Sequence, residues 1–307
     1  MIEQSVREWL LASDPAIEWQ TRRDLEGQTS GEVDRVRSRV AIEGWGASLL
    51  DAQQPNGGWS VVDQPTAFHE TADGSAMWAL DLLVDMGVDP DDDRVRASVA
   101  RVRDTVRFYE GDQPFFTGEV EPCINGRVLR SGSYFGEPNR DLLERLLGEQ
   151  LEDGGWNCDA PQSRRSSFHT TICVLEGLTE YQRTQGDSDR LQLATQRGQG
   201  YLLDRRMFRS LSTGEVIDPD WLTFSFPTHY HYDVLRGLDY LRSAGAAVDD
   251  RLEEAFAVVT SNRDDDGRWP LQNPHRDQPE LDLGETEGGP SRWNTLRALR
   301  VLDWAAG

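Results

Sequence analysis

A glycine–tryptophan turn recurs three times in this chain, and the repetition constrains the fold more than any other feature. The copies follow amphipathic stretches; they begin at Gln54, Gln150 and Asn262 and end at Trp59, Trp156 and Trp269. Weaker copies at residues 111–116 and 214–221 keep a glycine, acidic residues and a closing aromatic residue. With these copies the interval is ~40 to 50 residues, the length of a helix-pair repeat. We therefore expect one continuous array of helix pairs.

Two kinds of helical segment alternate between the turns. Charged segments with one apolar face predict outer helices at residues 6–11, 33–50, 91–108, 141–147, 189–207 and 249–259. Less charged segments, rich in small and apolar residues, predict inner helices at residues 15–25, 71–86, 123–134, 168–181, 230–241 and 291–304. Six such pairs can close a ring. The sequence therefore predicts an all-α fold, a single α/α-toroid domain over residues 1–307.

The charge of the chain disfavours some partners. It has 54 acidic residues against 32 basic ones, all of them arginine, and a net charge of -22. Nucleic acid and anionic membranes are disfavoured, because phosphate binding needs basic patches. An acidic surface without lysine is typical of proteins adapted to a salt-rich (halophilic) cytoplasm, where salt screens self-repulsion.

Neither the start of the chain nor its cysteines indicate a secreted or membrane protein. Residues 1–8 lack the basic and apolar regions of a signal peptide, and no apolar run reaches the ~18 residues of a membrane span. We expect a soluble, cytoplasmic protein. Cys123, Cys158 and Cys173 are an odd number, which argues against a disulfide framework and leaves thiols for metal binding or chemistry.

The turn at Gln150 to Trp156 resembles the QW-type repeat of the squalene-hopene cyclase and protein prenyltransferase β-subunit superfamily. The resemblance covers most of the chain. It implies an α/α toroid around a central cavity, with an isoprenoid or other apolar small molecule as ligand. It says little about the reaction, because members of the superfamily perform different chemistry on one scaffold.

Polar residues gather at the starts of the expected inner helices, which would all lie at one end of a ring. Cys123, Cys158 and His169 form the clearest set, because thiolates and imidazole bind zinc and three ligands with one open position suit catalysis. We therefore expect zinc there, supported by Glu121 or Asp159. A metal-free polar pocket and a set that only packs in the core are the alternatives, and packing is expected of Cys173.

These segments also resemble the zinc site of protein prenyltransferase β-subunits, in which an Asp-x-Cys and an aromatic-His-Thr hold the metal. The matching strings are Glu121-x-Cys123, Phe168-His169-Thr170 and the loop Asp159-Ala160-Pro161. Glutamate in place of aspartate and the additional Cys158 are departures, and those β-subunits work with an α-subunit partner that this sequence does not reveal. The Cys-Cys-His set is similar to that of zinc-dependent lanthionine cyclases as well, without their Cys-His-Gly signature.

An acid-catalysed cyclase without a metal is an alternative. Class II terpene cyclases protonate an alkene or epoxide from an Asp-x-Asp-Asp motif, and residues 89–92 match this string, but at the start of an outer helix, where capping is expected. His231 with Asp233, and Asp73, are better placed for proton transfer. Candidate substrate contacts at the expected mouth are His69, Asn125, Arg127, Tyr232, Arg292 and Trp293.

Arginines near the inner-helix starts, including Arg127, Arg130 and Arg236, could bind a diphosphate or carboxylate, or be ion-paired in so acidic a chain. The sequence as a whole predicts an isoprenoid-related transferase or cyclase with a zinc-bearing central pocket. The metal-free cyclase and a non-enzymatic lipid-binding or protein-interaction toroid stay open as alternatives.

Overall fold

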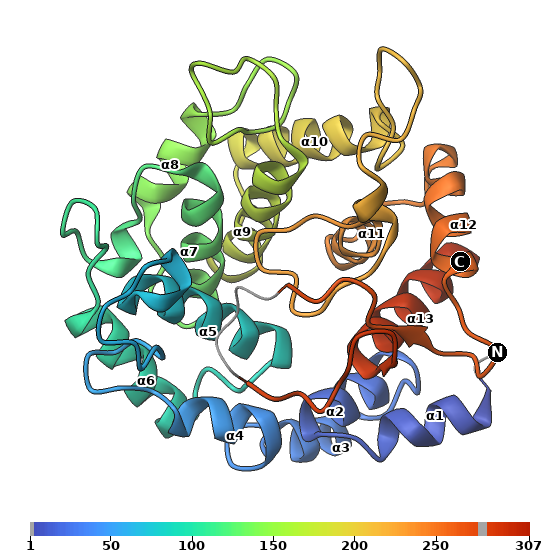
Figure 1. Cartoon of the computed structure of the whole chain (residues 1–307), viewed down its shortest axis with the longest axis horizontal. Coiled ribbons are helices and arrows are strands. Elements are labelled where there is room, and N and C mark those ends of the chain that lie inside the picture. Colours follow the sequence, from blue (N-terminus) through green and yellow to red (C-terminus); the bar gives the residue numbers. More distant parts are fainter. Residues whose placement is uncertain (1–2, 276–280) are drawn as a thin grey trace. The chain divides into compact units, whose positions relative to one another are not determined.

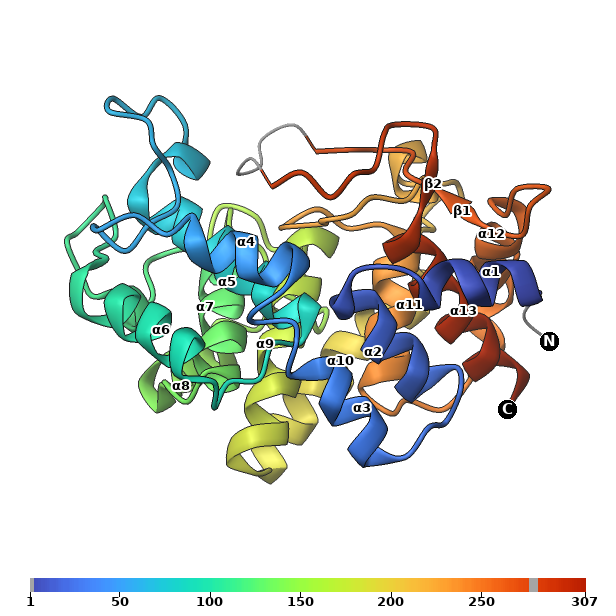
Figure 2. The same ribbon diagram turned by 90° about the horizontal axis from the view of Figure 1, so that it is seen from below.

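The computed structural model describes residues 3–275 and 281–307, and over these residues the protein is all-α (Figures 1 and 2). Thirteen α-helices are joined by turns and short 3-10 helices. The sheet in this part of the chain pairs only β1 (Trp269–Pro270) with β2 (Pro290–Ser291). The all-α prediction is therefore confirmed. No helix in the described ranges combines the length and the apolar character that crossing a bilayer needs.

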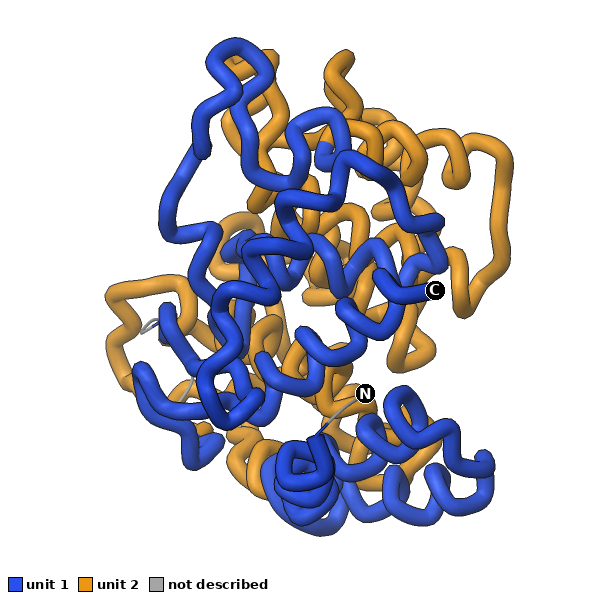
Figure 3. Tube along the Cα trace, turned by 90° about the vertical axis from the view of Figure 1, so that its right-hand side faces the viewer, with its two compact units in different colours: residues 1–45, 202–276, 282–307 blue, residues 46–201, 277–281 orange. Residues whose placement is uncertain are grey.

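The described chain forms two compact units (Figure 3). Unit 1 combines the two ends of the chain, residues 3–45 and 282–307, with residues 202–275. Unit 2 consists of residues 46–201 together with residue 281. Each unit is built from alternating inner and outer helices, as expected, and each is described by itself below. The single ring-shaped domain over residues 1–307 stays a prediction.

Unit 2 packs three buried helices side by side, with α7 in contact with both of the others (Figure 1). The buried helices are α5 (Ala72–Met86), α7 (Pro122–Tyr134) and α9 (Phe168–Gln185). The helices that bury one face are α4 (Gly44–Asp51), of which most belongs to this unit, α6 (Asp93–Thr105), α8 (Arg140–Gly148) and α10 (Asp189–Asp204). The predicted inner and outer segments of this region are therefore confirmed, within a few residues at their ends.

Glycines bring α7 and α9 close together. A Cβ atom added at Gly126 would lie 2.6 Å from the backbone oxygen of Cys173, and one added at Gly177 would collide with the backbone of Gly126. Side chains longer than hydrogen would therefore push the two helices apart. The contact also holds the first turns of both helices, which carry Cys123 and His169, in a fixed relative position.

Unit 1 follows the same plan around three buried helices, with α13 in contact with the other two. The buried helices are α2 (Pro15–Asp24), α11 (Val234–Ser243) and α13 (Arg292–Ala306). The helices that bury one face are α1 (Gln4–Leu11), α3 (Ser30–Arg37) and α12 (Glu253–Ser261). The inner helix expected at residues 230–241 is shorter than predicted at its start, because its capping residue is Asp233.

The helix predicted over residues 33–50 is wrong, since α3 ends at Arg37 and α4 begins at Gly44. Gly44 has a φ of 64°, and the amide of Trp45 donates to Asp14 Oδ2 at 2.7 Å. Asp14 Oδ1 accepts from Ala16 N at 2.8 Å, so this one carboxylate caps both α2 and α4. Burial raises the pKa of the Asp14 carboxyl group, because the carboxylate that forms this shared cap is withdrawn from water.

The three glycine–tryptophan turns share one hydrogen-bond pattern. The indole Nε1 donates to a carbonyl ten residues earlier, at 2.6 to 2.7 Å, in the pairs Trp59–Leu49, Trp156–Leu146 and Trp269–Val259. The tryptophan amide donates to a hydroxyl of the following buried helix, at 2.9 to 3.0 Å, in the pairs Trp59–Ser75, Trp156–Thr171 and Trp269–Thr295. Each turn therefore ties the end of one outer helix to the next inner helix.

A glutamine strengthens two of the turns, and in the first turn it is not the predicted one. Gln150 Nε2 donates to the backbone oxygens of Gly154 and Ala194, at 2.7 and 2.8 Å. The matching bonds in the first turn come from Gln53, at 3.1 Å each, rather than from Gln54. In the third turn the matching position carries Arg263, whose guanidinium lies 5.6 Å from the ring centre of Trp269.

The weaker copies form a different turn. Each begins with an isolated antiparallel bridge, between Arg107 and Pro114 or between Arg209 and Val216. Each is followed by a 3-10 helix, η2 (Phe115–Thr117) or η3 (Pro219–Leu222). The two copies thus resemble each other more than they resemble the tryptophan turns.

Candidate functional site

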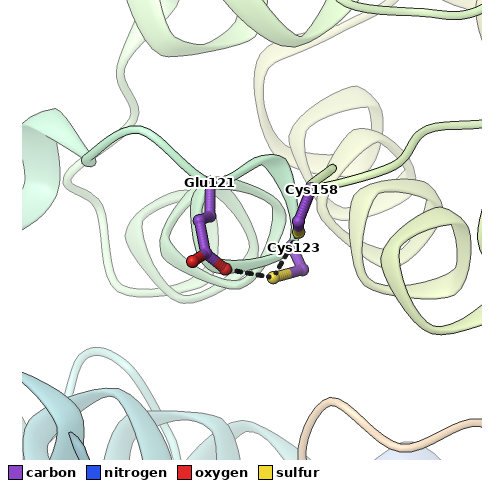
Figure 4. A group of neighbouring side chains, drawn as sticks. All are labelled: Glu121, Cys123 and Cys158. Carbon is purple, nitrogen blue, oxygen red and sulfur yellow. Dashed lines mark hydrogen bonds between the residues drawn. The ribbon is translucent and has the colours of Figure 1, made fainter. Parts of the chain in front are cut away.

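Two thiols and a carboxylate meet at the start of α7 (Figure 4). Pro122 opens this helix at a position where the chain needs no amide donor, which places Glu121 before the helix and Cys123 in its first turn. Cys158 comes from the loop that follows Trp156. Its Sγ lies 2.9 Å from Cys123 Sγ, which in turn lies 3.5 Å from Glu121 Oε2.

The two thiols differ in acidity. In the protonated pair Cys158 donates to Cys123, and Cys123 donates to Glu121. The pKa of Cys158 is lowered, chiefly by its hydrogen bond with Cys123 and further by the hydroxyl of Thr170 at 3.4 Å. The same bond, together with burial, raises the pKa of Cys123. When the pair loses a proton, the negative charge therefore falls on Cys158.

The donor types of this cluster suit zinc, but the sulfur spacing does not. The ligand atoms of Glu121, Cys123 and Cys158 all lie within 4.8 Å of one another. Around tetrahedral zinc, with Zn–S bonds of ~2.3 Å, two sulfur atoms would stand about 3.8 Å apart. Among the described residues, Glu121, Cys123 and Cys158 are the group of potential metal ligands that lie close together. His169, the expected third ligand, is not part of this group. Of the predicted set, the structure thus brings together the two thiols and Glu121.

Asp159 and His69 lie in the segments that precede α9 and α5. The Asp159 side chain is exposed, while its amide donates to Asn157 Oδ1 at 2.9 Å and its carbonyl accepts from Ser163 N at 2.8 Å. These bonds shape the loop between the Trp156 turn and α9. His69 is half-buried in the short 3-10 helix η1 (Phe68–Glu70), just before α5.

Asn125 and Arg127, predicted substrate contacts, are buried between structural partners. Asn125 donates to the backbone oxygen of Glu119 at 2.9 Å and accepts from its amide at 2.8 Å, which holds the segment before α7 in place. Arg127 forms an ion pair with Asp81 of α5, and its guanidinium lies 4.4 Å from the ring centre of Trp78. Both side chains therefore position α7.

Buried or half-buried arginine–aspartate pairs join inner helices in both units, and their acidic members were not predicted from the sequence. In unit 2, Arg130 Nη2 lies 2.6 Å from Asp85 Oδ1. In unit 1, Arg300 of α13 pairs with Asp24 of α2, and burial lowers the pKa of Arg300 to about 10. Of the two interpretations of these arginines, ion pairing is the one observed for Arg127 and Arg130. An isolated acidic residue in an apolar run, such as Asp81, was the available signal.

Asp73 is the predicted acid whose carboxylate is least engaged. It lies in the first turn of α5 and is only 3 % exposed. Its Oδ2 accepts from the amide of Tyr109 at 3.1 Å, and no described residue donates a hydrogen bond to its Oδ1. Tyr109 is 80 % exposed, and the exposed Phe68 is tied to the same helix start through Thr71, whose hydroxyl donates to the Phe68 carbonyl. The backbone of two exposed aromatic residues is thus bonded to the start of α5, which carries the buried Asp73.

His231 and Asp233, predicted as an acid–base pair, are each engaged by other groups. Asp233 caps α11: its Oδ1 accepts from Arg236 N at 2.7 Å, and its Oδ2 accepts from the hydroxyl and amide of Ser225, at 3.1 and 3.3 Å. The His231 ring stacks instead on His275, with 3.5 Å between ring centres. Because α11 begins after Asp233, this carboxylate closes the helix end, and the acid–base role of the pair stays a prediction.

Tyr232, Trp293 and Arg292 belong to aromatic clusters of unit 1. The buried Tyr232 donates its hydroxyl proton to a backbone carbonyl 2.7 Å away. Trp293 is also buried and stacks on Phe226, with 4.2 Å between ring centres. The Arg292 guanidinium lies 4.6 Å from the ring centre of Trp9. Packing therefore accounts for the positions of all three side chains.

The Asp-x-Asp-Asp string at residues 89–92 caps α6, as predicted. Asp92 Oδ1 accepts from the amides of Arg94 and Val95, at 2.8 and 3.3 Å. The last carboxylate of the string is therefore engaged by the backbone of an outer helix.

No family model matches the chain, and no curated protein matches its sequence. Among solved structures it is similar to the type II terpene cyclase MstE from Scytonema without ligand, at 16 % identity and a TM-score of 0.46, over 95 % of this chain and 87 % of that one. A protein from Actinoplanes has 16 % identity and a TM-score of 0.46, over 96 % and 91 %. A variant of MstE in complex with geranylgeranyl dihydroxybenzoate has 15 % identity and a TM-score of 0.43, over 95 % and 87 %.

Proposed function

We propose that the protein is an isoprenoid-related cyclase that works by acid catalysis, with Asp73 as the proton donor. The environment of the Asp73 carboxyl group carries this proposal, because one oxygen is held by Tyr109 N and the other accepts no hydrogen bond from the described residues. Asp233, in contrast, has both oxygens engaged by Ser225 and the start of α11. Asp73 is therefore the predicted acid best able to give a proton to a ligand.

The surroundings of Asp73 suit an apolar substrate. Exposed apolar residues occupy the segment before α5, where Val61 is 79 % exposed and Phe68 is also exposed, and the segment after α6, where Tyr109 lies. Clustered apolar side chains on a surface mark binding sites, and aromatic faces stabilise cations. In the proposed reaction the protonated carboxyl group transfers its proton to an alkene carbon. The resulting carbocation closes a ring and then loses a proton to regenerate an alkene, so the product is an isomer of the substrate.

Zinc-dependent chemistry is the second candidate, and the donor types of Glu121, Cys123 and Cys158 favour it, although the spacing of the two sulfur atoms would have to widen. These residues would hold zinc through two sulfur atoms and one oxygen, and zinc would supply Lewis-acid activation or lower the pKa of a bound thiol or water. Metal analysis of the purified protein tests this candidate. About one zinc per chain that is lost in Cys123→Ala would favour it, and folded protein without zinc would exclude it.

Deuterium incorporation tests the cyclase. The protein, dialysed against a chelator, is incubated in D2O with linear farnesyl and geranylgeranyl alkenes, and the products are identified by mass spectrometry. We expect a cyclic isomer that carries one deuterium, because the carboxyl proton exchanges with solvent. Asp73→Asn should lower turnover by about 10²-fold or more, the usual contribution of a general acid.

Asp141→Asn is the matched control, since it removes an exposed carboxylate from the first turn of the outer helix α8 and should keep the wild-type rate. A folded Asp73→Asn variant with wild-type turnover would exclude Asp73 as the acid. Absence of a cyclic product from every substrate would contradict the cyclase, and loss of activity after chelation would favour the zinc-dependent candidate.

A further inference from the structure

We propose that Cys123 and Cys158 form a redox-active dithiol that closes to an intramolecular disulfide when a hydroperoxide oxidises it. The two Sγ atoms lie 2.9 Å apart and come from separate segments, the first turn of α7 and the loop after Trp156. A disulfide bond measures about 2.05 Å, so the sulfur atoms need to approach by only about 0.9 Å. The proposal is independent of the proposed cyclase.

The two thiols are accessible to solvent and lie next to each other, in contrast to the third cysteine. Cys123 and Cys158 are both half-buried, whereas Cys173 is completely buried in α9. The hydroxyl of Thr170 lies 3.4 Å from Cys158 Sγ, within reach to stabilise a thiolate there, and the thiolate is the form of cysteine that attacks peroxides. Cys123 then stands next to it as the resolving thiol.

The oxidation balances in two steps. The Cys158 thiolate attacks the peroxide, the O–O bond breaks, and the products are a sulfenic acid and, after uptake of a proton, water or an alcohol. The sulfur of Cys123 then attacks the sulfenic sulfur, the S–S bond forms and the S–O bond breaks. The leaving hydroxide takes the proton of Cys123 and departs as water. The two sulfur atoms lose two electrons, which the peroxide accepts.

The disulfide would link the start of α7 to the loop before α9, and between these two segments the chain passes through the rest of α7 and through α8. It would fasten the loop at residues 157–167, which leads from the Trp156 turn to α9, onto the first turn of α7. Oxidation would therefore restrict the motion of this loop, and reduction would restore it.

Thiol counting on the full-length protein tests the proposal. The protein is treated with hydrogen peroxide, unfolded and alkylated with a maleimide, and its mass is compared with that of the reduced protein. We expect the oxidised chain to be about 2 Da lighter before alkylation and to take up two fewer maleimides. Dithiothreitol should reverse both changes, and a peptide map should join residues 123 and 158.

The variants separate this pair from other thiol chemistry. Cys173→Ser should behave like wild type, whereas Cys158→Ser should lose the peroxide-dependent change. Cys123→Ser should leave a sulfenic acid at Cys158 that dimedone traps. Wild-type protein that keeps all its thiols under peroxide, a disulfide that involves Cys173, or one bound zinc per chain that protects both thiols would each overturn the proposal.

Discussion

Replacing Thr171 by valine tests whether the tryptophan turn is held by its hydrogen bond to the next buried helix. Thr171 is completely buried in α9, and its Oγ1 accepts from the amide of Trp156 at 3.0 Å. Valine has nearly the shape of threonine, so the variant creates no cavity. The Trp156 amide, buried with its side chain, would lose its acceptor.

A buried donor without an acceptor costs about 1–3 kcal/mol of folding free energy. If unit 2, residues 46–201 with 281, unfolds as one domain, each kcal/mol lowers the melting temperature by about 2–4 °C. For a loss of about 2 kcal/mol we therefore expect Thr171→Val to melt about 4–8 °C below wild type. Calorimetry gives the melting temperature, and urea denaturation gives the free energy of unfolding.

Thr184→Val is the matched control, because Thr184 lies in the same helix, is exposed, and donates to its own helix at Glu180 O. It should change the free energy of unfolding by no more than about 0.5 kcal/mol. If Thr171→Val were as stable as Thr184→Val, the hydroxyl would not be what holds the turn, and the shared pattern of the three turns would need another explanation.

Two further predictions concern the backbone and the pH. Gly154 has a φ of 97°, and a Cβ added there would lie 2.6 Å from Arg197 O, whereas Gly186 has a φ of 93° with open space around it. Gly154→Ala should therefore unfold at a clearly lower urea concentration than Gly186→Ala. Equal urea midpoints for the two variants would show that the backbone moves away from Arg197 O without a measurable loss of stability. Asp249 has its pKa lowered to about 2 by its hydrogen bond with Arg251, so its contribution is present above pH ~4 and is lost as the pH falls towards 2. Because solvent reaches both side chains of this pair, the stability difference between wild type and Asp249→Asn should be at most about 0.5 kcal/mol near neutral pH and be largely lost by pH 2. A difference that stays constant with pH would contradict this.

The helices could be predicted from the sequence because their signals are local. The periodicity of α5, α7 and α9, and the glycine and tryptophan that separate helices, lie within the segments themselves. The errors arise where a residue far away in the sequence ends a helix, or where two neighbouring residues fit the same pattern. Asp14 caps the start of α4 and lies 31 residues before Trp45, so the interruption of the helix predicted at residues 33–50 depends on a remote residue. The adjacent Gln53 and Gln54 fit the repeat equally well, and the pattern cannot show which of them bonds to the turn.

The candidate site shows the same division. The types and spacing of Glu121, Cys123 and Cys158 predicted a shared cluster, and they form one. The spacing could not show that His169 lies outside this group, since that depends on how α9 turns its first residues against α7.

The sequence by itself determined the all-α class, the alternation of buried and exposed helices, and the chemical groups at the helix starts, because residue type and periodicity act locally. Only the tertiary structure decided which of these groups are engaged. Asp233 is saturated by Ser225 and the start of α11, whereas Asp73 receives one bond, from the distant Tyr109. Buried donors and acceptors need partners, and where the partner comes from a distant segment, as Tyr109 does for Asp73, only the fold brings the two together.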